Sequence, residues 1–203
     1  MDEFAQPLRE EDAARDPLRQ FEAWFAEAGG SERAPEAMAV ATTTPAGRPS
    51  VRMVLMKQFD ERGFVFYTNY ESRKAEELLA NPHAALLFHW ESLGRQVRIE
   101  GPAERLGAEE SAVYIRSRPR GSQLSALASP QSRPVESRQE LERLVAELAA
   151  LNKEGDLPLP EHWGGIRVSP ERYEFWQHRN DRLHDRLVYT PDRDGWAITR
   201  LAP

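Results

Sequence analysis

The 203-residue sequence contains no cysteine. This absence excludes disulfide bonds, thiolate nucleophiles and cysteine-ligated metals, and it fits the reducing cytoplasm, where we expect the protein to act. The sequence also has no apolar stretch of the length that crosses a bilayer. Its acidic start, Met1 to Phe4, lacks the basic region and apolar run of a signal peptide, so we expect neither secretion nor membrane insertion.

An excess of positive charge is absent as well. The formal net charge is −6, so the chain as a whole has no attraction for nucleic acid or for an anionic membrane surface. The 40% of hydrophobic and 30% of charged residues are ordinary for a soluble globular protein, and the length suits one main domain. Because residues 1–15 are polar and charged, we expect a mobile N-terminal arm, followed by a single domain over residues 16–203.

Familiar catalytic motifs are missing too. The sequence has no Gly-x-Gly-x-x-Gly, no phosphate loop, no His-Glu-x-x-His and no Gly-x-Ser-x-Gly, which excludes the common nucleotide-binding, zinc-protease and hydrolase classes. The histidines do not pair with carboxylates at the spacing of a metal-binding helix, so we expect no metal site; they are His83, His89, His162, His178 and His184.

What is present indicates a mainly β protein with helices. Apolar and alternating runs predict strands over 37–43, 49–58, 64–68, 83–90 and 96–101, and again over 166–168, 172–177, 186–189 and 196–201. Capping residues and apolar stripes predict helices over 17–28, 73–80, 108–118 and 138–151. Several antiparallel strands in succession suggest a barrel or a meander.

The segment from Arg52 to Lys74 organises the functional argument. It is expected to form a strand with Arg52 and Lys57 near its ends, a turn, a second strand and the start of a short helix. Arg73 and Lys74 lie in the first turn of that helix, where the dipole favours negative charge, and a bound anion would remove the conflict. The alternative is that both side chains are solvated, with Lys74 reaching a nearby glutamate.

Two other basic segments have the same two interpretations. A spacing of four places Tyr114 and Arg118 on one helix face, and the turn from Arg118 to Ser122 offers cations and a hydroxyl to a phosphate. Further on, an extended chain would put Arg182, His184 and Arg186 on one side, which suits an anionic ligand. Each segment is equally compatible with an exposed, solvated surface.

Seven short segments, taken together and in order, resemble the pyridoxine (pyridoxamine) 5′-phosphate oxidase family. They are RMVLMK (52–57), FYTNYESRK (66–74), RQVRIEG (95–101), SRPRGS (117–122), SPQS (129–132), EFW (174–176) and RLHDR (182–186). The resemblance covers roughly Asp16 to Pro203. It implies a homodimeric split β-barrel that binds flavin mononucleotide (FMN) at the subunit interface and oxidises pyridoxine or pyridoxamine 5′-phosphate to pyridoxal 5′-phosphate, with O2 reduced to hydrogen peroxide.

The resemblance also implies site residues. Those expected to bind FMN are Arg52, Met53, Val54, Leu55, Met56, Lys57, Tyr67, Thr68, Arg73, Lys74, Gln96, Gln131, Ser132, Trp176 and Arg186. Those expected to bind substrate are Lys57, Tyr114, Arg118, Ser122, Arg182 and His184. As a hypothesis, the flavin N5 accepts a hydride from the substrate C4′, Arg182 orients and stabilises the reacting edge, and His184 hydrogen-bonds the pyridine or assists proton transfer.

Two departures and three alternatives remain. The family's upstream Arg-Arg-x-Tyr segment has no clear counterpart, and Asp181 places an acid beside Arg182. A related flavin oxidase of another aromatic substrate, of the phenazine-pathway type, is the nearest alternative, although Lys57, Tyr114 and the 118–122 segment favour the vitamin phosphate. A non-catalytic module that holds FMN or pyridoxal phosphate is less favoured because Arg182 and His184 are intact. A nucleic-acid module is weakest at this net charge.

Overall fold

The computed structural model describes residues 7–153, 155, 157 and 160–203. Its strands are β1 (Ala37–Thr43), β2 (Pro49–Asp60), β3 (Gly63–Asn69), β4 (His83–Trp90), β5 (Arg95–Arg105), β6 (Trp163–Val168), β7 (Arg172–Gln177), β8 (Asp185–Asp192) and β9 (Gly195–Arg200). Its helices are α1 (Pro17–Gly29), α2 (Arg73–Ala80), α3 (Ala108–Ser117), α4 (Arg120–Ala128) and α5 (Arg138–Leu151), with short 3-10 turns η1 (Glu91–Leu93) and η2 (Asn180–Arg182). Each predicted strand is confirmed, with ends shifted by a few residues.

Six of these strands close into an antiparallel barrel in the order β1-β2-β3-β6-β5-β4, and β4 pairs back with β1. Strands β7, β8 and β9 extend the sheet from the first half of β5. Strand β5 therefore changes partner along its length, from β7 before Gly101 to β6 after it. At that point a Cβ on Gly101 would lie 1.9 Å from the Ser169 carbonyl oxygen, so only glycine fits. The predicted split β-barrel is confirmed.

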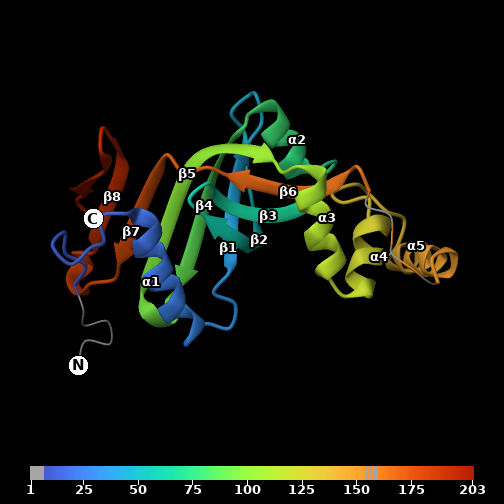
Figure 1. The fold of residues 1–203 in the computed structure, drawn as a ribbon, viewed down its shortest axis with the longest axis horizontal. Coiled ribbons are helices and arrows are strands. Elements are labelled where there is room, and N and C mark those ends of the chain that lie inside the picture. Colours follow the sequence, from blue (N-terminus) through green and yellow to red (C-terminus); the bar gives the residue numbers. More distant parts are fainter. Residues whose placement is uncertain (1–6, 154, 156, 158–159) are drawn as a thin grey trace.

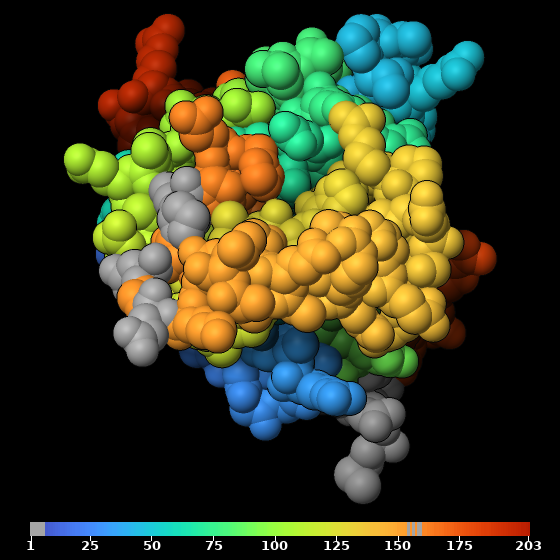
Figure 2. All heavy atoms as spheres, turned by 90° about the vertical axis from the view of Figure 1, so that its right-hand side faces the viewer, coloured from blue at the N-terminus to red at the C-terminus, as the bar shows by residue number. Residues whose placement is uncertain are grey.

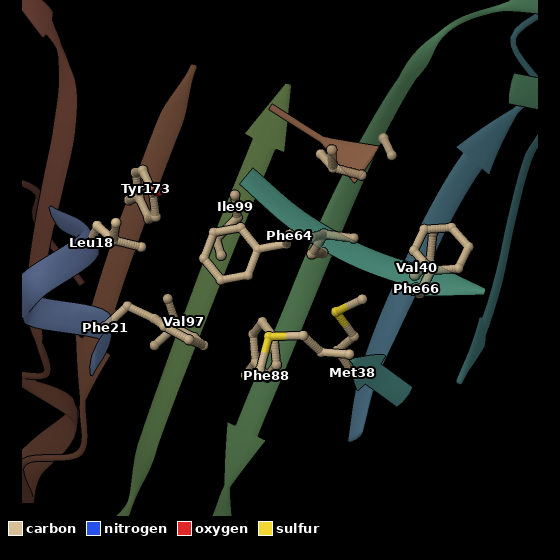
Figure 3. Close-up of a cluster of buried hydrophobic side chains, with 14 of the residues drawn as sticks. Leu18, Phe21, Met38, Val40, Phe64, Phe66, Phe88, Val97, Ile99 and Tyr173 are labelled. Atoms are coloured by element: carbon tan, nitrogen blue, oxygen red, sulfur yellow. The ribbon is translucent and has the colours of Figure 1, made fainter. Parts of the chain in front are cut away.

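Helix α1 covers one end of the barrel core, as its apolar stripe predicts. Asp16 caps it by accepting a hydrogen bond from the Leu18 amide, and Pro17 occupies the first turn. The Phe21 ring is fully buried and meets Phe64 edge-on with ring centroids 4.8 Å apart (Figure 3). Phe88 lies 5.0 Å away on another side of the same ring. Truncating Phe21 to alanine would lower the free energy of unfolding by about 3–5 kcal/mol. Helix α1 is therefore an integral part of the barrel core.

The described part of the expected N-terminal arm, residues 7–15, lies against the C-terminal strands. The Leu8 amide donates to an Asp185 carboxylate oxygen at 3.1 Å, and Leu8 is buried. Arg200 bonds both Glu10 and Asp185, each at 2.7 Å. These contacts differ from the expectation of a segment with little to hold it down, because the residues that hold it are more than 170 positions away in the sequence.

The helical part was only partly foreseen. The capping box is confirmed, since Ser137 accepts a hydrogen bond from the Glu140 amide at the start of α5. The predicted basic turn over 118–122 is wrong in its second half, where Arg120 begins α4. Because Gly121 lowers the helix propensity of this segment, the sequence did not indicate α4. Figure 2 shows α5 on the outside of the molecule, and none of its described side chains is fully buried.

Candidate functional site

A cavity of about 500 Å³ opens between the barrel wall and the helices α3 and α4. Four cations, Arg52, Lys57, Lys74 and Arg118, border it, and none of its lining residues is a carboxylate. The other lining residues are Met53, Val54, Leu55, Tyr67, Thr68, Asn69, Tyr114, Ser122, Ser125, Ala126, Ser129, Gln131 and Trp163. In a chain of net charge −6, this concentration of positive charge without a carboxylate in the lining favours an anionic ligand.

Lys74 is the most deeply placed of these cations. Its side chain is buried, and its ammonium donates to Gln131 Oε1 at 2.7 Å, Thr68 Oγ1 at 2.9 Å and Ser72 Oγ at 3.1 Å. Burial, together with the positive charge of Arg52, lowers the pKa of Lys74 to about 8. None of its three partners is charged. The alternative in which Lys74 pairs with a glutamate on the surface is therefore wrong.

Arg52 is held in place by the strand beside it and by a buried carboxylate. Its guanidinium donates to the Val40 carbonyl at 3.1 Å and to Thr42 Oγ1 at 2.6 Å, and it lies 3.6 Å from Glu77. Burial by itself would raise the pKa of Glu77, but hydrogen bonds from Ser50, Thr42 and Arg73 outweigh it and lower that pKa to about 2. Glu77 is therefore ionised and fixes Arg52 at the cavity edge.

Arg73 does not line the cavity in this structure. Its side chain is 60% exposed, and its Nε donates to Glu77 Oε1 at 2.9 Å. It is the first residue of α2 and the sequence neighbour of Lys74, so a rotation of its side chain would bring a further cation to the helix N-terminus. Ser72 precedes the helix as predicted, but its hydroxyl donates to the Asn69 carbonyl and makes no capping bond.

Three aromatic rings form one wall of the cavity. Tyr67 on β3 stacks on Tyr114 of α3 with centroids 3.8 Å apart, and Trp163 at the start of β6 lies parallel to both. The Arg118 guanidinium lies over the Trp163 ring, 5.3 Å from its centroid. Burial raises the pKa of Tyr67 to about 12, so its phenol is neutral. Tyr114 and Arg118 thus reach the same cavity, as their spacing predicts.

Lys57 occupies an irregular position on β2. The pairing between β2 and β3 shifts by one residue between Met56 and Gln58, so Lys57 is the extra residue of a β-bulge. Met56 is buried in the core while Lys57 borders the cavity, because neighbouring residues of a strand face opposite sides. Met56 itself does not line the cavity, so its side chain is not available to a ligand there. Ser122, in the first turn of α4, borders the same cavity.

Most of the remaining expected site residues form a second group on the far side of the molecule, whereas Ser132 directly follows the cavity-lining Gln131. Gln96 on β5, Trp176 on β7 and Arg186 on β8 are directly opposite one another in register. Figure 1 shows β7 and β8 at one side and α3 and α4 at the other. None of these residues lines the cavity, nor do Arg182, His184 or Ser132. One subunit alone therefore does not bring the two groups together.

Arg182 and His184 are not on an extended strand, so the predicted alternation over 182–186 is wrong. The strand β8 starts only at Asp185, and the turn η2 before it holds Asp181 at φ 55° and Arg182 at φ 62°. The left-handed conformation is strained for residues other than glycine, and such strained residues are often found at functional sites. The His184 ring packs 4.6 Å from that of Trp176, and its Nδ1 accepts the Arg179 amide at 3.1 Å.

Sequence reasoning missed five residues that line the cavity, which are Asn69, Ser125, Ala126, Ser129 and Trp163. Trp163 was assigned only to the connection that leads into the final strands, and Glu77 was considered only as a surface partner of Lys74. A Trp-Gly-Gly sequence carries no binding signal of its own, because the ring acquires its role from Tyr114 and Arg118 on another element. The pairing of Glu77 with Arg73 could have been predicted, since Glu77 lies one helical turn after Arg73.

The donors present fit a flavin mononucleotide. A buried ammonium without a charged partner and a nearby guanidinium suit a phosphate dianion, while the exposed backbone of β2 and apolar Met53 and Leu55 suit a ring system. Among the described residues, no group of three or more histidine, aspartate or glutamate side chains is arranged to hold a metal ion. Within the same residues, no helix has the length and apolar character required to cross a membrane.

Comparisons with known proteins agree with this geometry. Residues 25–152 match the family model described as pyridoxamine 5′-phosphate oxidase, and residues 163–203 match that of the pyridoxine 5′-phosphate oxidase C-terminal dimerisation region. The chain is 57% identical to the pyridoxine/pyridoxamine 5′-phosphate oxidase of Rubrobacter xylanophilus, covering 97% of this chain and 91% of the relative. The corresponding protein of Gluconobacter oxydans is 56% identical, covering 95% and 96%.

Solved structures share the fold. A crystal structure of PhzG from Burkholderia lata, in complex with tetrahydrophenazine-1-carboxylic acid, matches with a TM-score of 0.91 and 34% identity over 98% of this chain and all of that one. An FMN-binding, pyridoxamine 5′-phosphate oxidase-related protein of Nostoc punctiforme has a TM-score of 0.73 at 18% identity, covering 92% and 98%, and supports the fold alone. The cofactor is FMN, and the chain belongs to the pyridoxamine 5′-phosphate oxidase family.

Proposed function

We propose that the protein is an FMN-dependent oxidase that converts pyridoxine 5′-phosphate and pyridoxamine 5′-phosphate to pyridoxal 5′-phosphate, with O2 reduced to hydrogen peroxide. The amine substrate also consumes one water and releases ammonia. The observation that carries the proposal is the cavity lined by four cations and an aromatic wall, in a chain more than half identical to oxidases of this name. FMN, when bound, supplies the acceptor for a hydride from the substrate C4′ and returns the electrons to O2.

The FMN phosphate is assigned to the end of the cavity near α2. Lys74 offers a buried ammonium there, Arg52 a second cation, and Thr68 and Gln131 hydrogen-bonding groups. Arg73 is near enough in sequence to add a third cation once its side chain leaves Glu77. The exposed stretch of β2 from Met53 to Leu55 would face the flavin ring, with backbone groups available along the strand.

The substrate phosphate is assigned to the opposite part of the cavity, near α3 and α4. Arg118 and Lys57 provide charge there, and Tyr114 and Ser122 provide hydroxyls. Among the described residues no carboxylate pairs with Arg118 or Lys57 within 4.0 Å, so both charges are available to a phosphate ester. This division gives each of the two phosphates in the reaction its own cations.

We propose that the second group of site residues reaches the cavity from the other subunit of a homodimer. Three observations support this assembly. The group lies within residues 163–203, apart from Gln96, and that segment matches a dimerisation region. Val51, Met53 and Leu55 alternate along β2 with 67%, 65% and 44% of their surface exposed, and such an apolar stripe beside a binding cavity suits a protein interface. Within a single subunit the two groups of site residues lie on opposite sides of the molecule.

Within that dimer, Arg182 and His184 would act on the substrate. Arg182 carries a positive charge on an exposed turn and would stabilise the electron-rich edge of the pyridine ring. His184 accepts a hydrogen bond at Nδ1, so its proton is on Nε2, from which it can donate to an oxygen or nitrogen of the substrate. Burial, with His178 and Arg182 nearby, lowers the pKa of His184, so the ring is neutral at pH 7.

One alternative has specific support. The 34% identity to PhzG over nearly the whole chain favours a related flavin oxidase with a carboxylated aromatic substrate, but the uncompensated Arg118 and Lys57 favour a phosphate. A non-catalytic FMN carrier would bind flavin without turnover.

We also propose that the protein acts in the cytoplasm, because it has no cysteine.

The deciding experiment is to purify the protein and test whether it is yellow. Pyridoxal 5′-phosphate and hydrogen peroxide would then be measured in air with each phosphorylated substrate, with pyridoxine and a tetrahydrophenazine carboxylate as controls. The proposal expects equimolar aldehyde and peroxide from the phosphorylated substrates only. A yellow protein that produces no peroxide from any substrate would indicate a carrier, and preference for the phenazine would indicate the alternative oxidase.

A further inference from the structure

We infer that Trp163 is a positioning residue for the substrate phosphate site. This inference rests on the function proposed above. Trp163 borders the cavity, yet only 6% of its surface is exposed. It starts β6, where it pairs with Asn69 of β3, so the barrel itself fixes its backbone. The ring is thus a rigid surface against which more mobile side chains can be placed.

Two of the residues assigned to the substrate contact this ring. The Arg118 guanidinium lies 5.3 Å from the Trp163 centroid, within the range of a cation–π interaction. The Tyr114 ring is parallel to it, with an interplanar angle of 3° and centroids 6.1 Å apart. Arg118 follows the last residue of α3, where its long side chain has many rotamers and, among the described residues, no salt bridge to select one.

The Trp163 ring favours one rotamer of Arg118 without neutralising the positive charge of its guanidinium. A carboxylate beside Arg118 would fix the guanidinium equally well but would cancel the charge that a phosphate needs. An indole face attracts the cation through its quadrupole and leaves the N–H groups at the edge of the guanidinium free to donate. Trp163 therefore prepares Arg118 for a phosphate ester and sets the preference for phosphorylated over unphosphorylated substrates.

The test replaces Trp163 by leucine, which removes the π face and keeps apolar bulk, and by phenylalanine, which keeps a smaller face. Without the cation–π contact we expect the KM for the phosphorylated substrate to rise about 10-fold in Trp163→Leu and about 3-fold in Trp163→Phe. We expect kcat, the FMN dissociation constant and the inhibition constant of unphosphorylated pyridoxine, added as a competitor, to stay within about 2-fold of the parent values. Inorganic phosphate should inhibit Trp163→Leu less strongly than the parent.

A matched control is available in Trp24, which carries Arg95 over its ring at 4.4 Å and does not line the cavity. Trp24→Leu should lower thermal stability without changing the KM for the phosphorylated substrate or the inhibition constant of pyridoxine. The double variant Trp163→Leu with Arg118→Gln should bind the phosphorylated substrate no more weakly than Arg118→Gln alone, since both act through one contact.

Other outcomes overturn the inference. Equal losses of affinity for the phosphorylated substrate and for pyridoxine, with matching losses in kcat and FMN affinity, would make Trp163 a purely structural residue, as would additive effects in the double variant. If the parent protein itself forms no pyridoxal 5′-phosphate, the function proposed above fails instead. Phosphate binding to the parent and to Trp163→Leu then still tests the inference, because equal affinity would contradict it.

Discussion

Lys74 and Gln131 are 57 positions apart in the sequence, and the Lys74 ammonium donates to the Gln131 amide oxygen at 2.7 Å. The loop after α4 is thereby tied to the first turn of α2. Because the amide is neutral, the contact leaves the lysine charge available, and burial beside Arg52 lowers the pKa of Lys74 to about 8. The affinity of this site for a phosphate should therefore depend on pH in a range where the phosphate itself is fully ionised.

The first prediction concerns that dependence. Below pH 8 Lys74 is protonated in the free protein, and above pH 8 it must take up a proton when a dianion binds. The FMN dissociation constant should thus be flat up to about pH 8 and then rise, by at most about tenfold per pH unit for one proton. Flavin fluorescence titrations from pH 6.5 to 9.5 measure this. Lys74→Met should bind weakly at every pH, and a parallel rise in that variant would refute the assignment.

The second prediction separates turnover from cofactor retention. Arg182 is on an exposed turn away from the cavity of its own subunit, so Arg182→Ala should lower kcat about 100-fold and leave the FMN dissociation constant within about 2-fold. Arg193→Ala, an exposed arginine on the turn between β8 and β9, is the matched control and should change neither quantity. Steady-state peroxide formation and flavin titration measure both. Equal loss of turnover and FMN would remove Arg182 from its catalytic role.

The strands and the cationic end of the cavity could be predicted from the sequence because both follow from local patterns. Alternating residues give β5, and a strand, turn and helix bring Lys57 and Lys74 to one cavity. The conformation of Arg182 could not be predicted, since the left-handed turn at Asp181 and Arg182 interrupts an apparently extended segment. The role of Trp163 could not be predicted because its partners come from other elements, and Glu77 was assigned to the wrong cation because Arg52 reaches it from β2.

The third prediction concerns acid stability. The folded pKa of Glu77 is about 2, against 4.5 as its usual value, so its contribution to folding is complete above pH 4.5 and is lost as pH falls toward 2. Glu77→Gln should lower the free energy of unfolding by about 3 kcal/mol at pH 7 and by almost nothing near pH 2. Urea unfolding at both pH values measures this difference. A gap that is independent of pH would show that packing, and not charge, accounts for the loss.

The fourth prediction compares the two cations at the start of α2. Lys74 is buried in the cavity, whereas the Arg73 side chain is 60% exposed and paired with Glu77. Since a charge-assisted hydrogen bond contributes about 1.5–3 kcal/mol, Lys74→Ala should weaken FMN binding about 100-fold, and Arg73→Ala about 10-fold. Titration of the apoprotein with FMN tests the order. An unchanged dissociation constant for Arg73→Ala would mean that Arg73 stays on Glu77 when the cofactor binds.

The last prediction concerns a buried carboxylate in the second group of site residues. Glu174 on β7 is almost fully buried between Arg186 Nε at 2.8 Å and Arg98 Nη2 at 2.9 Å. Arg186 also donates to the Ala202 carbonyl at 2.9 Å, so its guanidinium is held from two sides. Glu174→Gln would leave two cations facing each other with only an amide between them. The repulsion would displace Arg186, which is the side chain assigned to FMN.

Glu100→Gln provides the control, since Glu100 pairs with Arg98 at 2.9 Å but its side chain is 41% exposed. Glu174→Gln should weaken FMN binding about 10-fold, while Glu100→Gln should have almost no effect on it, because exposed ion pairs contribute little. Flavin titration gives the affinities, and sedimentation velocity shows whether each variant keeps the parent's oligomeric state. If Glu174→Gln binds FMN like the parent while its thermal stability falls, then Glu174 stabilises the sheet and does not place Arg186.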